Sequence, residues 1–224
     1  MKSLAVDTVV LDVDGTLVDS VYTHVQAWSH AFQAIGTQVP CWRIHRAIGM
    51  GADRLVTEVA GQRVEQALGD RVRELHDAYY EDLFGMVRAL PGADDLLAAL
   101  RKAGFTVVLA SSGNEEQTER AMDLLAASDV ASARVSSADV DATKPAPDLV
   151  EAAVGRAGGT RAALVGDSVW DVEAAVLAGI PAIGLLCGGF SEAELLEAGA
   201  VAVFDSPEDL AARFDESGLA YTPS

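Results

Sequence analysis

The chain has 224 residues, of which 50% are hydrophobic, and its 34 acidic residues against 16 basic ones give a net charge of −18. This length can bury one large α/β domain, or a core domain with a smaller insert. The negative charge repels nucleic acid and anionic membrane surfaces, and no apolar run approaches the ~20 residues of a membrane span. Cys41 and Cys187 are too few for a disulfide scaffold, and residues 1–7 lack the apolar core of a signal peptide. We therefore expect a cytoplasmic protein with no nucleic-acid or membrane partner.

The first predicted element is a buried strand over Thr8–Leu11, and two acids follow it directly, in the run Asp12-Val13-Asp14-Gly15-Thr16. Alternate side chains of a strand share a face, so Asp12 and Asp14 are expected to crowd one small volume. Two like charges this close are costly unless a cation or a shared proton lies between them. Turn chemistry at a strand end is the alternative interpretation.

Residues 18–88 are rich in helical patterns and contain no convincing strand. The expected helices are Val18–Ile35, Arg43–Ile48, Ala52–Leu68 and Asp70–Phe84. We interpret residues 18–88 as an inserted α-helical cap domain, with residues 85–92 as the return hinge and residues 1–17 and 89–224 as the core domain. The alternative is that these helices thicken one side of the sheet.

The second half of the chain alternates strand-like and helix-like segments, which predicts an α/β fold with a doubly wound parallel sheet. The expected strands are Phe105–Ala110, Arg134–Ser136, Ala162–Gly166, Pro181–Leu186 and Val201–Phe204. The expected helices are Ala93–Ala103, Glu115–Ala126, Pro147–Ala157, Val169–Ala178, Glu192–Ala198 and Pro207–Phe214. Ser191 and Ser206 stand where N-caps are expected, and the last residues, Glu216–Ser224, are expected to be a frayed tail.

Three later motifs also follow strands or precede helices. Ser111-Ser112-Gly113 offers a hydroxyl and free N–H groups that suit a phosphate oxygen. Lys144 precedes a helix. The N-terminal end of a helix disfavours a cation, so this position predicts an anion near Lys144. Asp167 ends a strand, and Asp171 follows in the first helical turn.

Parallel strands end at one edge of a sheet, so these groups are expected to meet Asp12 and Asp14 there. Carboxylates are the ligands that Mg²⁺ prefers. The sequence therefore predicts a metal-assisted phosphate site.

With these four motifs in order, the chain resembles the haloacid dehalogenase-like hydrolase superfamily in its helical-cap subgroup. The resemblance implies that Asp12 is the nucleophile, forms an aspartyl-phosphate and ligates Mg²⁺. It implies that Asp14 protonates the leaving alcohol, then activates water, and ligates the metal through its main-chain carbonyl. Ser111 and Lys144 would hold the phosphoryl oxygens, with Ser112 and Gly113 beside them. Asp167 would complete the metal site, and Asp171 would support it through water or Lys144.

The cap loop Ile48–Leu55 resembles that of phosphoglycolate phosphatase-like members. There Arg54, or alternatively Arg46, could meet a substrate carboxylate, although Arg54 could equally be a solvated loop residue. Two other branches fit poorly. A dehalogenase has no use for the extra acids, and phosphonate cleavage in this superfamily uses a cap lysine, which residues 18–88 lack.

The expected function is Mg²⁺-dependent hydrolysis of a small phosphorylated metabolite by a monomer or homodimer. A sugar phosphomutase of the beta-phosphoglucomutase type is the alternative, because Thr16 and His24 have counterparts there; Gly166 and Ala52 replace an acid and a base that such mutases carry. A non-catalytic binding module on the same fold is the other alternative. The histidines show no ligand spacing, so His24 is expected to be a satisfied interfacial residue, with a cleft-facing His24 as the alternative. Trp170 is expected to pack at the core–cap junction.

Overall fold

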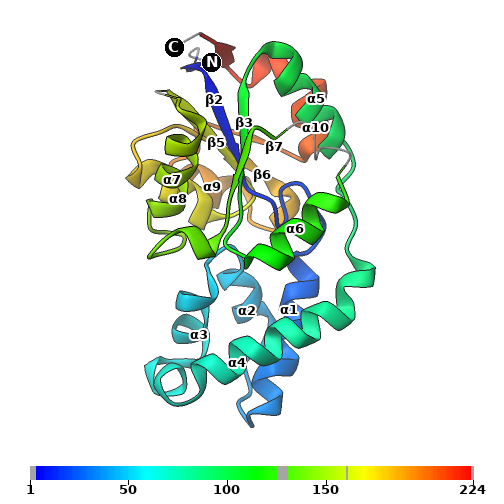
Figure 1. The fold of residues 1–224 in the computed structure, drawn as a ribbon, viewed down its shortest axis with the longest axis vertical. Helices are drawn as coiled ribbons and strands as arrows, with labels where there is room; N and C mark the ends of the chain where they lie inside the picture. The colour runs from blue at the N-terminus through cyan, green and yellow to red at the C-terminus, as the bar shows by residue number, and fades with distance from the viewer. Residues whose placement is uncertain (1–3, 126–130, 160, 223–224) are drawn as a thin grey trace.

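The computed structural model describes residues 4–125, 131–159 and 161–222. A parallel sheet flanked by helices forms one part of the molecule, and the helical insert forms the other (Figure 1). Both ends of the described chain lie at the end of the sheet that is remote from the insert. The predicted α/β fold with a helical insert is therefore confirmed.

The central sheet has six parallel strands in the order β4-β3-β2-β5-β6-β7. Its strands are β2 (Thr8–Leu11), β3 (Thr106–Ala110), β4 (Ala133–Val135), β5 (Ala162–Gly166), β6 (Ala182–Leu185) and β7 (Ala202–Phe204). β2 lies between β3 and β5, where the strand order reverses, so the chain leaves β2 at the crevice in which open α/β sheets bind ligands.

Helices cover both faces of this sheet because its strands are apolar on both sides. The helices of the sheet domain are α5 (Ala93–Ala103), α6 (Glu115–Asp123), α7 (Asp148–Ala157), α8 (Val169–Leu177), α9 (Glu192–Ala198) and α10 (Pro207–Ala212). Along β2, Val9 and Leu11 pack into the cluster that contains α5 and α10, while Val10 packs into the one that contains α7, α8 and α9. Among the described residues, no helix has both the length and the apolar character needed to cross a membrane.

Four helices form the insert between β2 and β3, and they bury an apolar cluster of their own. They are α1 (Val21–Ala34), α2 (Cys41–Ala47), α3 (Ala52–Ala60) and α4 (Gln62–Leu83). The predicted break between the last two was wrong: it falls at Gly61, not at Gly69. Gly61 has a φ of +87°, which stops α3 and reverses the chain. Gly69 lies inside α4 with the Glu65 side chain folded over it.

The expectation of a frayed tail was also wrong for most of its length. A short strand β8 (Leu219–Tyr221) pairs in parallel with β1 (Leu4–Val6) in a separate two-stranded sheet. Leu219 is buried in the same apolar cluster as Val6, so the tail has a hydrophobic anchor. Residues 223–224 and Ala126 of the predicted helix Glu115–Ala126 lie outside the described residues.

Candidate functional site

Asp12 and Asp14 leave β2 at the centre of the sheet and enter a tight turn. Leu17 and Val18 both donate backbone hydrogen bonds to the carbonyl of Val13. Gly15 has a φ of +88°, which lets the chain reverse its direction here. The turn aims the two carboxylates at different partners. Asp12 faces acids and a lysine of the sheet domain, whereas Asp14 faces hydroxyls and a histidine of α1.

Asp12, Asp167 and Asp171 form a buried carboxylate cluster. Each offers an oxygen within 4.8 Å of the others, and the three residues are 5% exposed or less. The first directly follows β2, the second directly follows β5, and the third lies in the first turn of α8. The Asp14 side chain lies outside this cluster, so its predicted role as a metal ligand rests on its main-chain carbonyl and stays a prediction.

The Lys144 ammonium is the cation of this cluster. It contacts the Asp12 carboxylate and lies 2.7 Å from Asp171 Oδ1, with its side chain fully buried. Burial alone would lower the pKa of Lys144, but the two carboxylates outweigh it and raise that pKa above its ordinary value. The lysine is therefore charged, and it offsets one of three negative charges.

The remaining charge of the cluster favours a divalent cation. Burial raises the pKa of Asp12 to about 7, since Lys144 offsets it only in part and Asp171 and Asp14 add repulsion. Burial and the neighbouring acids also raise the pKa of Asp167 well above its ordinary value. Three carboxylates with one lysine fit a hard divalent ion, which would let all three stay ionised.

Two glycines leave the room that Asp167 needs. A Cβ on Gly188 would lie 1.9 Å from Asp167 Oδ2, and one on Gly15 would lie 2.3 Å from the same oxygen. The other oxygen of Asp167 accepts a 2.8 Å hydrogen bond from the Thr16 hydroxyl. The backbone thus closes around this carboxylate and fixes its direction.

Asp14 has a different environment, which keeps it ionised. Its Oδ1 accepts a 2.7 Å hydrogen bond from Ser20 and lies 3.3 Å from His24 Nε2, and its Oδ2 accepts a 3.0 Å bond from Ser111. Burial would raise the pKa of Asp14, but the hydrogen bonds and the charge of His24 outweigh it and lower that pKa to about 2.

A chain of side chains continues from Asp14 into the insert. His24 Nδ1 lies 3.1 Å from His76 Nε2, and His76 Nδ1 lies 3.0 Å from Asp77 Oδ1. Every link is satisfied when one of the two imidazoles carries both ring protons and the other carries one. The sequence interpretation treated His24 as interfacial and missed His76 and Asp77, because the contact between His24 and His76 joins residues 52 positions apart.

The Ser111–Gly113 segment lies at the end of β3 and leads into α6. Ser111 is fully buried, and its hydroxyl also accepts a 3.0 Å hydrogen bond from Gly113 N–H. Ser112 and Gly113 line the adjoining cavity. Asn114 caps α6 by accepting from Gln117 N–H at 2.9 Å, so the positive end of the α6 dipole is directed toward this cavity.

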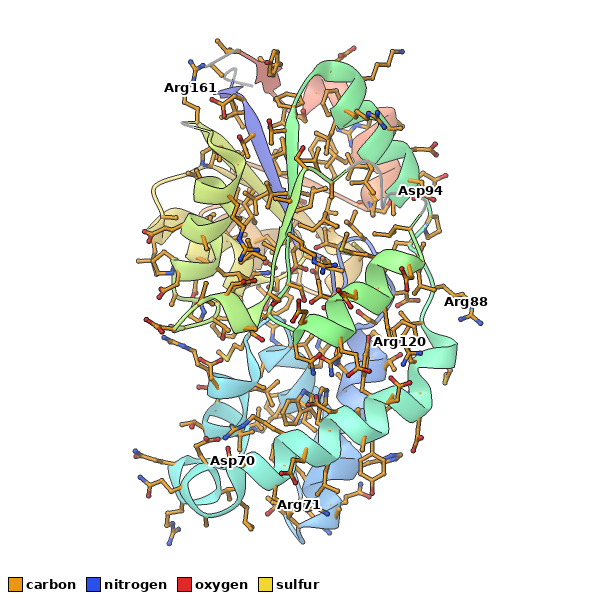
Figure 2. All side chains as sticks on the ribbon, viewed as in Figure 1. Asp70, Arg71, Arg88, Asp94, Arg120 and Arg161 are labelled. Atoms are coloured by element: carbon orange, nitrogen blue, oxygen red, sulfur yellow. The ribbon has the colours of Figure 1, made fainter. Side chains whose placement is uncertain are left out.

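A cavity of about 530 Å³ lies between the sheet domain and the insert, with Asp12 and Asp14 in its lining. Contacts between the two parts close around it. Ser112 Oγ donates to the carbonyl of Gly49 at 3.2 Å, and Trp170 Nε1 donates to the carbonyl of Arg46 at 3.0 Å. The latter confirms the expected position of Trp170. Figure 2 shows Arg120 of α6 beside α4, where it pairs with Glu81.

The predicted arginines do not line this cavity, and a third one does. Arg54 is half-exposed beside Asp53, and Arg46 pairs with Glu194 and lies over the ring of Phe190. Arg73 of α4 is the lining arginine. The sequence offered no signal for Arg73, because the face of α4 that meets the cavity depends on how the insert packs against the sheet domain.

Comparison with known proteins gives the same assignment for most of the chain. The haloacid dehalogenase-like hydrolase family matches residues 6–179. A phosphoglycolate phosphatase of Yersinia pestis is 32% identical over 206 residues, which cover 84% of each chain. One from Cupriavidus necator is 29% identical and covers 97% of each chain. The crystal structure of a hydrolase from Pseudomonas syringae is 35% identical with a TM-score of 0.88, covering 93% of this chain and 98% of that one.

Proposed function

This chain belongs to the haloacid dehalogenase-like hydrolases, and from that premise we propose that it is a Mg²⁺-dependent phosphatase that cleaves a small phosphomonoester through an aspartyl-phosphate. One observation carries the proposal: a buried lysine and three buried carboxylates meet at a strand end where the cavity opens. A pure binding site for phosphate has no need of this excess of negative charge.

Asp12 is the proposed nucleophile. It lines the cavity, and one of its oxygens is held by Lys144. In the first step an oxygen of Asp12 attacks phosphorus, and the bond between phosphorus and the alcohol oxygen breaks. A covalent intermediate divides a slow hydrolysis into two easier transfers. Lys144 fixes the carboxylate and offsets negative charge on the phosphoryl group.

Asp14 is the proposed acid and base. The leaving alcohol needs a proton in the first step, and Asp14 and His24 together hold one between Oδ1 and Nε2. A phosphate dianion beside Asp14 raises its pKa and so favours transfer of that proton to the carboxylate. The ionised Asp14 then takes a proton from the water that attacks the aspartyl-phosphate.

Mg²⁺ would be held by Asp12, Asp167 and the carbonyl of Asp14, with Asp171 supporting the site through Lys144. When bound, the ion would neutralise phosphoryl charge and keep Asp12 ionised. Ser111, Ser112 and Gly113 would hold the phosphoryl oxygens, aided by the dipole of α6.

Residues 18–88 are the proposed cap domain, and its opening would admit the substrate. The proposed substrate is a small phosphorylated metabolite, in accord with the names of the relatives. Phosphoglycolate is therefore the first compound to assay. A cytoplasmic location and a monomeric or dimeric state remain predictions from the sequence.

The test is phosphate release from a panel of small phosphomonoesters, with Mg²⁺ or with EDTA. We expect release that requires Mg²⁺ and falls by about 10³-fold or more in Asp12→Asn, because the amide cannot form the acyl phosphate. Asp123→Asn is the control, since it removes the same charge from the end of α6 outside the site. Equal activity of wild type and Asp12→Asn would overturn the mechanism.

Asp14→Asn separates the two steps. With p-nitrophenyl phosphate the leaving group needs little protonation, so phosphorylation of Asp12 continues while water attack loses its base. We expect a burst of p-nitrophenol and accumulation of a phosphorylated protein, detected by intact mass.

Interconversion of sugar phosphates without net phosphate release would instead favour the mutase.

A further inference from the structure

The part of the cavity that would receive the leaving alcohol is acidic. Asp53, Glu65, Asp77 and Asp141 line it, and Arg73 is the one arginine or lysine that lines it among the described residues. Asp12 and Asp14 occupy its other end. The walls between these groups are apolar or aromatic, with Trp28 and Leu55 as examples.

Arg73 is engaged with groups of the insert itself. Its guanidinium makes a bidentate pair with Glu65, at 3.0 and 2.9 Å, and a further contact with Asp70 at 2.8 Å. It also donates to the carbonyl of Ala52 at 3.2 Å. Hydrogen bonding to Glu65 raises the pKa of Arg73, against the effect of burial. Two carboxylates therefore neutralise this arginine before any substrate binds.

The other basic residues near the cavity are also committed. Lys144 lies between Asp12 and Asp171 at the phosphate end. Arg46 pairs with Glu194 at 2.6 Å, outside the cavity lining. Among the described residues that line the cavity, a second anionic group on the substrate would meet acids and one arginine that two carboxylates already hold.

Several carboxylate oxygens of this region remain open. Asp77 Oδ1 accepts from Gln117 at 2.9 Å and lies 3.0 Å from His76 Nδ1, which leaves Asp77 Oδ2 for a donor. Asp53 Oδ1 accepts from Thr143, and its Oδ2 lies 3.9 Å from Arg54 Nε. Asp141 is exposed and makes no hydrogen bond or ion pair with the other described residues. A positively charged donor suits such oxygens.

We propose that the substrate is a phosphomonoester of an amino alcohol, whose ammonium group lies at Asp77 and Asp141 while its phosphate lies at Asp12. This inference rests on the proposed function and specifies its leaving group. It separates this chain from relatives named for phosphoglycolate, whose leaving group carries a carboxylate.

Two matched pairs of substrates test the charge alone. Phosphoethanolamine and ethylene glycol monophosphate differ in a terminal ammonium against a hydroxyl, and phosphoglycolate and its amide differ in a carboxylate against a carboxamide. We expect kcat/KM for phosphoethanolamine to exceed that of the glycol ester by about tenfold, and phosphoglycolate to be slower than its amide by a similar factor. Both ratios shrink as ionic strength rises.

Three variants locate the effect. Asp77→Asn and Asp141→Asn are each expected to lower the ammonium preference about threefold or more. Glu65→Gln removes one neutralising partner of Arg73 and is expected to raise kcat/KM for phosphoglycolate relative to its amide. Glu58→Gln removes one charge from the exposed side of the insert, away from the cavity lining, and should leave both ratios unchanged.

The outcomes separate the inference from the function on which it rests. Phosphoglycolate as the better member of its pair, or no advantage for the ammonium, overturns the amino-alcohol assignment and leaves the phosphatase intact. The same ratios in all three variants as in wild type also overturn it. Failure to release phosphate from any of the four compounds, or from the wider panel, removes the phosphatase and the inference together.

Discussion

The fold surrounds His76 so closely that its imidazole stays neutral near physiological pH. His76 is 4% exposed, packed between His24, Trp28 and Tyr80. Burial lowers its pKa to about 4, although Asp77 opposes part of that shift. A second proton on His76 would also face His24 across 3.1 Å. His76 is therefore expected to be the ring that carries a single proton in the chain behind Asp14.

This shift predicts acid sensitivity. The unfolded chain binds a proton at His76 below the ordinary value of 6.5, whereas the folded protein does so only near 4. Neutral His76 therefore makes its full contribution to the free energy of unfolding above about pH 6.5. That contribution, roughly 3 kcal/mol at most, is lost as the pH falls toward 4. Urea unfolding at about pH 7.5 and 5 should show a smaller loss for His76→Gln than for wild type.

The control for this measurement is His30→Gln, because His30 is exposed on α1. That variant should retain the acid loss of wild type. The same loss in His76→Gln as in wild type would contradict the assignment to His76.

Individual candidate site residues could be predicted where a motif follows a strand. Asp12 and Lys144 are brought together as expected, since each stands at the same edge of a parallel sheet. Arg73 and Asp77 could not be predicted, because α4 is polar around much of its surface and no local pattern says which polar face meets the cavity.

At the level of elements, β1 and β8 join the two ends of the described chain. Leu4 N–H donates to the carbonyl of Gly218 at 2.7 Å, and Thr222 N–H donates to that of Val6 at 2.9 Å. The ring of Tyr221 packs edge-on against Phe105. At three residues, β8 is too short for its own sequence to predict a strand, and pairing with β1 is what makes it one.

Ending the chain after Ser217 tests the weight of this pairing. The deletion removes a buried leucine and several backbone hydrogen bonds, so we expect a loss of about 2–4 kcal/mol. The Tm should fall by roughly 5–10 °C in calorimetry. kcat/KM below the transition should stay unchanged, because this sheet lies at the end of the molecule away from the insert. Tyr221→Phe keeps the ring and should match wild type; an unchanged Tm after the deletion would contradict the anchoring role.

At the scale of the whole molecule, folding brings the acidic residues behind the net charge of −18 closer together and so increases their repulsion. The carboxylate cluster at Asp12, Asp167 and Asp171 is its most buried part. Monovalent salt screens the exposed charges but reaches a buried cluster poorly. A divalent ion bound there should therefore stabilise the protein beyond the effect of ionic strength.

Asp167→Asn tests this expectation. The raised pKa of Asp167 means that, without a metal, the folded state loses stability as pH rises above 3.8 through that raised pKa. In EDTA the variant should therefore be more stable than wild type at about pH 8, by an amount that shrinks toward pH 5. The Thr16 hydrogen bond can persist to the amide oxygen.

Magnesium should make wild type more stable than Asp167→Asn, the reverse of their order in EDTA. At matched ionic strength and ~100-fold excess over its Kd, Mg²⁺ should raise the Tm of wild type by roughly 5–10 °C. It should raise that of Asp167→Asn little, and sodium chloride should act alike on both. An equal response of the two proteins to Mg²⁺ would place the ion elsewhere.

Local patterns in the chain are enough to predict the order of strands and helices. They also identify the acids and the lysine at the strand ends. Hydrophobic period and strand-end position are short-range properties, and a parallel sheet gathers strand ends at one edge. How the insert meets the sheet domain depends on pairs such as Asp77 with Gln117, which are 40 positions apart. The amphipathic pattern of a helix marks a buried face without naming what covers it. The charges that line the insert side of the cavity are therefore a property of the tertiary structure alone.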